Sequence, residues 1–324
     1  MKRVLQKSMA QAMDAAMCGM MNALQWRRRS GVCTRVEFDT YLASCETVTR
    51  EEFYPLVSFA PRREDIWLRW ESPVFSGFTE NDRVKVRLYL CDEAFRAPTV
   101  IILHALMSAS DLGYQRVARW FNAHGWNVAF PHLPFHYSRT PGGYFNGELA
   151  ITANLVRNAE TLRQGVMELR QLMGWFREQG TSEFALLGTS FGGWNAALLS
   201  SLEADLRFVG LVQPIVNVEA AIWENPTAAV MRRLLVRQGI NRGEIVRHAH
   251  LSSPMHGVPL CGGERVILTA GVYDTVSPRA ELVALRELWP GTTLLDVKQG
   301  HFGYSALRET LREIARRLGV PDAV

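Results

Sequence analysis

Segments with the patterns of strands and helices alternate along this chain from about residue 66 to the C-terminus. Thr99–Leu103 is an unbroken run of β-branched residues that ends in leucine, a pattern typical of a parallel strand buried on both faces. Longer stretches with helical periodicity, such as Leu155–Arg177, separate the strand-like runs. This alternation predicts an α/β fold, with a mostly parallel sheet covered by helices on both faces. The other expected strands are Ile66–Trp70, Val84–Leu90, Asn127–Phe130, Phe184–Leu187, Phe208–Val212, Val266–Thr269 and Thr293–Val297, and the other expected helices are Tyr114–Ala123, Phe191–Leu202, Arg279–Leu288 and Tyr304–Leu318.

Two stretches interrupt the alternation. Residues 131–147 hold three prolines and three glycines, which predicts a loop beyond a strand end. Residues 217–259 lie between two predicted strands and are far longer than an ordinary connection. Because long insertions of this kind usually shape a substrate site, we expect an inserted cap over residues 217–259.

The first 30 residues are the most basic part of the chain. They hold six basic residues and one acid, Asp14, whereas the whole chain has a formal net charge of +4, so the remainder is close to neutral. Apolar residues at spacings of three and four predict an amphipathic helix over residues 1–30, ahead of a main domain over residues 31–324. Asp14 interrupts the apolar stretch, which argues against a secretory signal. Such a helix fits either packing against the body or a second subunit, or a peripheral membrane contact.

Composition excludes several classes of protein. A hydrophobic content of 48% and a charged content of 21% are those of a soluble globular protein, and no apolar run is long enough for a transmembrane helix. The nearly neutral residues 31–324 argue against a nucleic-acid binder. Five scattered cysteines without a CxxC pair indicate neither a disulfide framework nor a zinc site. They favour a cytoplasmic compartment, and residues 1–30 leave a membrane-peripheral location open.

A G-x-S-x-G motif lies between a predicted strand and a predicted helix. It reads Gly188-Thr189-Ser190-Phe191-Gly192. This context predicts a sharp turn that lifts the Ser190 hydroxyl above the sheet, and the glycines let neighbouring backbone approach closely. The start of the following helix adds backbone N–H donors at the place where an oxyanion would form.

An acid and a histidine follow later strands in the same way. Asp274 comes just beyond Val266–Thr269, and His301 lies in a glycine-flanked loop beyond Thr293–Val297. The chain order Ser, Asp, His therefore predicts a nucleophile, an orienting acid and a base. Asp296 and Glu219 are the rival acids, with Asp274 preferred because Asp296 falls inside a predicted strand.

These segments resemble the α/β-hydrolase superfamily, in its serine-esterase and lipase-like branch. The resemblance runs from about residue 66 to the C-terminus and is most specific in GTSFGG, GVYDTVSP and GHFGYS. It implies the α/β-hydrolase fold with an inserted cap. It also implies a catalytic triad without metal or organic cofactor, in which Ser190 is the nucleophile, Asp274 the orienting acid and His301 the base.

The resemblance further implies an oxyanion hole. Its first donor would be the backbone N–H of Phe191, and the second would come from the loop after Thr99–Leu103. There His104-Ala105-Leu106 resembles the family's His-Gly-X sequence, which points to the N–H of Leu106. Ala105 stands where glycine is usual, and alanine would be strained if that position needed a positive φ.

Three further residues are expected to contact the substrate, namely His104, Arg139 and Trp194. For each of them a structural role is the alternative: holding the oxyanion loop for His104, a salt bridge for Arg139 and core packing for Trp194. No histidine or cysteine pattern indicates a metal site, and no cofactor is expected.

Together these features predict a serine hydrolase that cleaves a small or medium carboxyl ester or thioester through an acyl-serine intermediate. An acyltransferase with the same triad remains open, as does a catalytically silent binding protein on the same fold. The expected partner is a small-molecule acyl ester. Membrane contact or self-association is expected only through residues 1–30.

Overall fold

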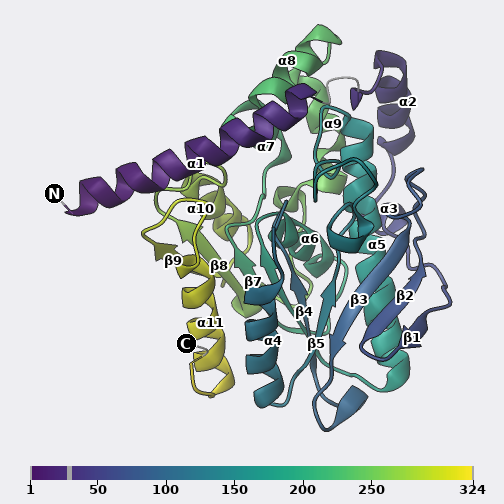
Figure 1. Ribbon diagram of the computed structural model, residues 1–324, viewed down its shortest axis with the longest axis vertical. Coiled ribbons are helices and arrows are strands. Elements are labelled where there is room, and N and C mark those ends of the chain that lie inside the picture. The colour runs from purple at the N-terminus through teal and green to yellow at the C-terminus, as the bar shows by residue number, and fades with distance from the viewer. Residues whose placement is uncertain (1, 28–30, 323–324) are drawn as a thin grey trace.

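A sheet of nine strands forms the centre of the computed structural model, which describes residues 2–27 and 31–322 (Figure 1). The strand order is β1-β2-β3-β5-β4-β6-β7-β8-β9, and the six strands from β5 to β9 in this order are mutually parallel. The predicted α/β fold with a mostly parallel sheet is therefore confirmed. The strands are β1 (Arg62–Glu64), β2 (Trp67–Glu71), β3 (Arg83–Tyr89), β4 (Thr99–Leu103), β5 (Asn127–Pro131), β6 (Phe184–Thr189), β7 (Leu206–Val212), β8 (Val266–Gly271) and β9 (Thr293–Val297).

Burial follows the sequence pattern of each strand. Every residue of β4 and β5 is buried, as their continuous apolar runs predict, whereas burial alternates along β3, which pairs antiparallel with β2 and β5. Strand β1 was not predicted from the sequence. It consists of three exposed charged residues at the sheet edge and therefore has no apolar pattern.

Helices cover both faces of the sheet. The helices α5 (Leu155–Gln179), α6 (Phe191–Ser200) and α10 (Arg279–Leu288) pack into one hydrophobic cluster with one side of the strands. The helices α4 (Leu112–Ala123) and α11 (Ser305–Leu318) pack into the cluster on the other side. Within β4 the side chains alternate between the two clusters, because successive residues of a strand point to opposite faces.

Other helices come from the connection between β7 and β8 and from residues 31–65. The segment between β7 and β8 folds as α7 (Val218–Trp223), α8 (Ala229–Arg237) and α9 (Arg242–Ser252), all within the stretch expected to form a cap. Residues 31–65, for which the sequence predicted no element, contain α2 (Arg35–Cys45) and α3 (Arg50–Phe53).

The long helix α1 (Lys2–Arg27) lies across this upper part of the molecule (Figure 1). Residues 1 and 28–30 of the helix expected over residues 1–30 lie outside the described part. Side chains of α1 bond to distant backbone at both ends: Gln6 donates to the Lys298 carbonyl, and Asn22 donates to Pro226 and accepts from the amide of Val230. Thus α1 packs against the body, between the loop after β9 and the segment that contains α7 and α8. No helix in residues 2–27 or 31–322 has the length and apolar character needed to cross a membrane.

The start of α6 touches the sheet through backbone alone. A Cβ atom at Gly192 would overlap the carbonyl group of Leu103, and one at Gly188 would overlap the carbonyl of Gly192. Only glycine allows this contact between α6, β4 and β6.

We expect Gly192→Ala to lower the free energy of unfolding by about 1–3 kcal/mol, because the added methyl group must displace rigid backbone. Urea unfolding followed by circular dichroism measures the change. Gly113→Ala is the matched control, since a Cβ atom at that α4 position meets nothing within 4 Å. Equal stabilities of the two variants would contradict the proposed contact.

Candidate active site

Four neighbouring parallel strands end at the same edge of the sheet, and the loops that follow them build the site. Ser190 follows β6, Gln213 follows β7, Asp274 lies three residues beyond β8, and His301 lies beyond β9. Residues far apart in the chain thus meet, because the carboxyl ends of parallel strands share one edge.

Ser190 lies on a strained turn between β6 and α6. Its backbone has φ 52° and ψ −111°, outside the regions that non-glycine residues usually occupy. The amide of Ser190 donates to the Val212 carbonyl at 2.8 Å, and the amide of Trp194 donates to the Ser190 carbonyl at 2.9 Å. These bonds hold the turn on β7 at one side and on α6 at the other.

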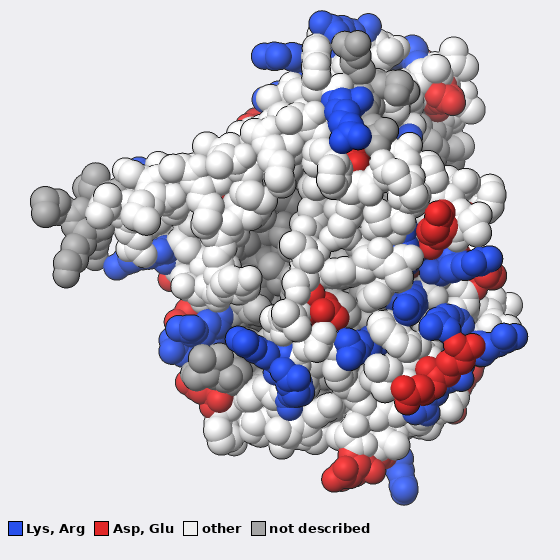
Figure 2. Space-filling model, in the orientation of Figure 1, with Lys and Arg blue, Asp and Glu red and all other residues white. Residues whose placement is uncertain are grey.

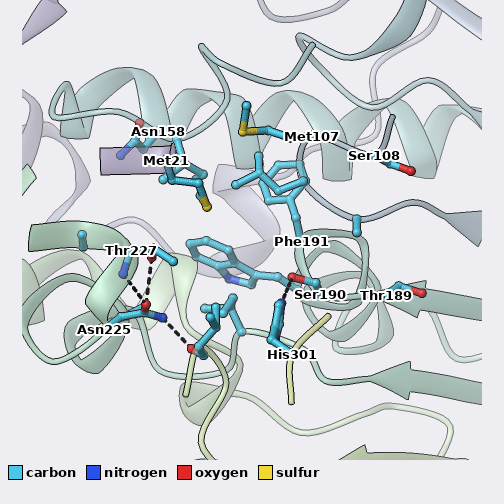
Figure 3. A pocket seen from close by; sticks show the side chains of 18 of the residues that line it. Met21, Met107, Ser108, Asn158, Thr189, Ser190, Phe191, Asn225, Thr227 and His301 are labelled. Atoms are coloured by element: carbon cyan, nitrogen blue, oxygen red, sulfur yellow. Dashed lines mark hydrogen bonds between the residues drawn. The ribbon is translucent and has the colours of Figure 1, made fainter. Parts of the chain in front are cut away.

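A chain of hydrogen bonds joins the three predicted catalytic residues. Ser190 Oγ lies 2.9 Å from His301 Nε2, and His301 Nδ1 lies 2.9 Å from Asp274 Oδ2 (Figure 3 shows the first contact). Since an ionised carboxylate only accepts, Nδ1 carries the proton that it donates to Asp274, and Nε2 is free to accept the serine proton. Burial alone would lower the pKa of His301, but the charge and hydrogen bond of Asp274 and the charge of Asp14 raise it above its ordinary value.

Asp274 is itself fixed by its surroundings. Its Oδ1 accepts the amides of Val276 and Ser277, each at 2.8 Å, and its Oδ2 accepts from Gln213 Nε2 as well as from His301. The carboxylate therefore stays in one orientation toward the imidazole ring.

Gln213 is a site residue that the sequence analysis missed. It has φ 47°, and its Nε2 donates both to Asp274 and to the carbonyl of Gly300, while its Oε1 accepts from Gln299. One amide side chain thus ties the acid loop to the base loop. Its position directly after a buried parallel strand was the sequence signal that could have identified Gln213 as a site residue.

The rival acids lie on the surface. Asp296 forms a salt bridge with Arg279 at 2.7 Å, and Glu219 pairs with Arg242. Neither carboxylate contacts His301.

Two backbone amides of residues that line the same cavity as Ser190 have no partner among the described residues. Phe191 is the first residue of α6, so its N–H has no partner within the helix. In the loop after β4, Ala105 N donates to Tyr114 Oη and Met107 N to His136 Nε2, whereas the Leu106 amide has no acceptor within residues 2–27 and 31–322. The positive φ of this loop, 55°, falls at Met107 and not at Ala105, so the strain considered for alanine does not arise there.

No family model matches the chain. Two uncharacterized proteins of Mycobacterium tuberculosis, from strains CDC 1551 / Oshkosh and H37Rv, are each 28% identical to it over 230 residues. The match covers 66% of this chain and 52% of each relative, so the chain spans about half the length of the curated relatives it matches.

Solved structures resemble the chain over most of its length. Acetyl xylan esterase 1 from Thermoanaerobacterium sp. JW/SL YS485 has a TM-score of 0.58 and 16% identity, covering 89% of this chain and 95% of that one. The acetyl xylan esterase from Paenibacillus sp. R4 has a TM-score of 0.58 and 12% identity, covering 88% and 96%. The acylaminoacyl peptidase of Pyrococcus horikoshii has a TM-score of 0.52 and 13% identity, covering 81% and 40%. The chain has the α/β-hydrolase fold.

Within this α/β-hydrolase fold, His104 supports a loop and does not face the cavity, which corrects the predicted substrate contact. Its side chain is fully buried; Nδ1 donates to the Ala105 carbonyl, and Nε2 accepts the amide of Leu133 at 3.0 Å. The neighbouring His136 accepts the Met107 amide, and burial lowers its pKa to about 4, so the ring stays neutral and keeps this acceptor.

Arg139 is also removed from the cavity, which corrects the second predicted contact. Its guanidinium group is buried and forms a bidentate salt bridge with Glu168 of α5, at 2.6 and 2.7 Å. It also donates to the carbonyls of Asn81 and His132. The charge therefore holds the loop after β5 against α5.

A large apolar cavity opens beside Ser190. Its volume is about 960 Å³, and it runs from His301 under α1 to α2, α5 and the helices α7, α8 and α9. Trp194, the third predicted contact, does line it, with Nε1 bonded to the Ser252 carbonyl. Figure 3 shows Met21, Met107 and Phe191 around the same space, and Figure 2 shows α1 as a mostly uncharged bar above a hollow in this face. Four methionines of α1 form part of the lining: Met13, Met17, Met20 and Met21.

No group of three or more metal-ligating side chains gathers anywhere in residues 2–27 and 31–322. The polar groups at the cavity wall beside Ser190 are a hydroxyl group, an imidazole and backbone amides.

We expect Arg139→Met to lower the free energy of unfolding by about 3–5 kcal/mol, because Glu168 would remain as an unpaired buried charge. The turnover of the folded fraction should stay near that of the unchanged protein, since Arg139 does not line the cavity. Urea unfolding and activity per folded molecule measure the two effects. The double variant Arg139→Met/Glu168→Gln is the control and should recover part of the stability. If the single variant were as stable as the unchanged protein but had lost turnover, Arg139 would have a role in substrate binding and not a structural one.

Proposed function

We propose that this protein is a serine hydrolase that cleaves a carboxyl ester or thioester through an acyl-serine intermediate. The observation that carries the proposal is the hydrogen-bonded chain from Ser190 Oγ through His301 to Asp274, with 2.9 Å at each step, at the wall of an apolar cavity. A hydroxyl group in contact with an oriented imidazole is an activated nucleophile.

The reaction follows from the positions of these groups. Ser190 Oγ attacks the acyl carbonyl carbon while His301 Nε2 takes the serine proton. The bond to the alcohol or thiol then breaks, and His301 gives this proton to the leaving group. A water molecule, deprotonated by His301, attacks the acyl-serine; the acid leaves and the proton returns to Ser190. Asp274 stabilises the imidazolium that forms in both halves.

The amides of Phe191 and Leu106 are the proposed oxyanion donors. In support, neither amide has a partner among the described residues, and both residues line the cavity that contains Ser190. Backbone donors that are already in place stabilise the tetrahedral oxyanion without reorganisation.

The cavity supports a larger acyl group than the small or medium one that the sequence suggested. A volume of about 960 Å³ is near the upper end of ordinary ligand sites, and its lining is mostly apolar. Burial of each additional methylene group in such a lining contributes about 0.8 kcal/mol. We therefore propose a long aliphatic acyl chain that extends beneath α1.

We expect the unchanged protein to react with a fluorophosphonate probe and to hydrolyse p-nitrophenyl esters, with kcat/KM rising from the acetate through the octanoate to longer chains. Ser190→Ala should lose both labelling and turnover, with the rate falling by about 10⁴-fold or more. Gel fluorescence measures labelling, and p-nitrophenol release measures turnover.

The matched control is Ser253→Ala, which changes a buried serine outside the triad and should keep both activities. A soluble, folded protein that neither labels nor turns over any ester would favour the silent binding protein. Release of p-nitrophenol that increases with added alcohol, without an equal increase in free acid, would favour an acyltransferase.

The raised pKa of His301 predicts the acid side of the pH–rate profile. The base must be neutral to accept the serine proton, so kcat/KM should fall as the pH decreases through a value above 6.5, the ordinary pKa of histidine. Ester hydrolysis from pH 5 to 9 measures the profile, with the uncatalysed rate subtracted. The rate of fluorophosphonate labelling should show the same fall toward low pH, which is the acid limb of the profile. A profile that is flat down to pH 5 would exclude His301 as the base.

A further inference from the structure

Asp14 is the only acidic residue of α1, and its side chain is completely buried. It lies on the inner face of α1, the face that also contains Met17 and Cys18 three and four residues later. No described basic side chain forms an ion pair with it. A buried carboxylate without a cation is costly, so its surroundings must compensate for the lost hydration.

The compensation comes from the two loops that carry the acid and the base. The Asp14 carboxylate accepts the amide of His301 at 2.9 and 3.1 Å, and it also accepts the amide and the hydroxyl group of Thr275, each at 3.1 Å. Thr275 is the neighbour of Asp274. One carboxylate thus holds the backbone of the base and the backbone beside the orienting acid in a single arrangement.

The base loop is shaped to admit this carboxylate. A Cβ atom at Gly300 would lie 2.7 Å from Asp14 Oδ1, closer than real Cβ atoms come to other atoms, and 3.0 Å from Oδ2. Glycine at position 300 therefore leaves room for the carboxylate of Asp14, which is 286 residues earlier in the sequence but adjacent in space.

We propose that Asp14 is a positioning residue for the base, so that α1 completes the active site and does not only cover it. This inference rests on the proposed function. Asp14 fixes the backbone of His301, and its negative charge favours the imidazolium that forms during each proton transfer.

The charges around the imidazole agree with this role. The titratable groups that face it are Asp274 from the β8 loop and Asp14 from α1, and both carboxylates also face the Cys18 thiol. Burial and these two charges raise the pKa of Cys18 to about 11, so the thiol is neutral. Burial favours the neutral imidazole, yet Asp274 and Asp14 together outweigh it and raise the pKa of His301.

Asp14→Asn is the variant that tests the inference, with ester hydrolysis measured from pH 5 to 9. We expect kcat to fall roughly 10- to 100-fold with little change in KM, since a displacement of about 1 Å at a reacting group costs up to about 10²-fold. The acid limb of kcat/KM should move to lower pH, because loss of a negative charge makes the imidazolium less stable. Asp14→Glu keeps the charge, so its acid limb should stay in place while part of kcat is restored.

Asn22→Ala is the matched control, because Asn22 anchors α1 to the cap through Pro226 and Val230 without touching the base loop. It should keep the kcat and the acid limb of the unchanged protein. Alkylation of Cys18, followed by mass spectrometry, reports whether α1 stays docked: this thiol is only 3% exposed and should remain protected in every variant that is read for activity.

Fluorophosphonate labelling of the unchanged protein separates the two levels of the proposal. If the unchanged protein does not label, the proposed function fails. If it labels and turns over, an unchanged kcat and acid limb in Asp14→Asn, or an equal loss in Asn22→Ala, overturns the positioning role. If Asp14→Asn releases α1 from the body, the test rests on Asp14→Glu. An acid limb of kcat/KM that moves to lower pH in Asp14→Glu, although the negative charge is retained, overturns the positioning role.

Discussion

The start of α6 lies directly on the carboxyl ends of β4 and β6, and backbone meets backbone there without an intervening side chain. Gly188 and Gly192 allow this contact. It forces the chain through the turn at Ser190. The strain of a φ of 52° at this residue is offset by the packing on both sides of the turn. The same contact brings the first amide of α6 next to the loop that contains Leu106. The positions of Ser190 and of both proposed oxyanion donors therefore depend on the close approach of α6 to β4 and β6.

Side chains from outside each loop then fix the remaining geometry. Gln213 joins the acid loop to the base loop from the end of β7, and Asp14 joins them again from α1. These contacts use polar atoms in a buried region, where an unmade hydrogen bond is costly and a satisfied network is rigid. The imidazole of His301 is consequently held through its backbone as well as through its ring.

The polar residues around the site divide into those that face the cavity and those that support its walls. His104 and Arg139 are chemically suited to bind a substrate, yet their hydrogen-bonding groups are used up by backbone carbonyls, an amide and Glu168. The cavity itself is bounded mostly by apolar side chains, many of them from α1 and from the helices between β7 and β8. Methionine suits such a lining because its flexible side chain adapts to ligands of different shape.

The sequence by itself determined the strands from β2 to β9, the helices that cover the two faces of the sheet and the three residues that meet at its edge. Apolar periodicity is local, and the G-x-S-x-G turn, Asp274 and His301 each follow a strand, so their meeting follows from parallel topology alone. Only the tertiary structure decided what Asp14 does. Its sequence context shows an acid that interrupts an apolar helix face, while its partner at His301 is 287 residues away. The cavity volume and the buried roles of His104 and Arg139 likewise depend on how separate elements pack, and no local pattern encodes such long-range contacts.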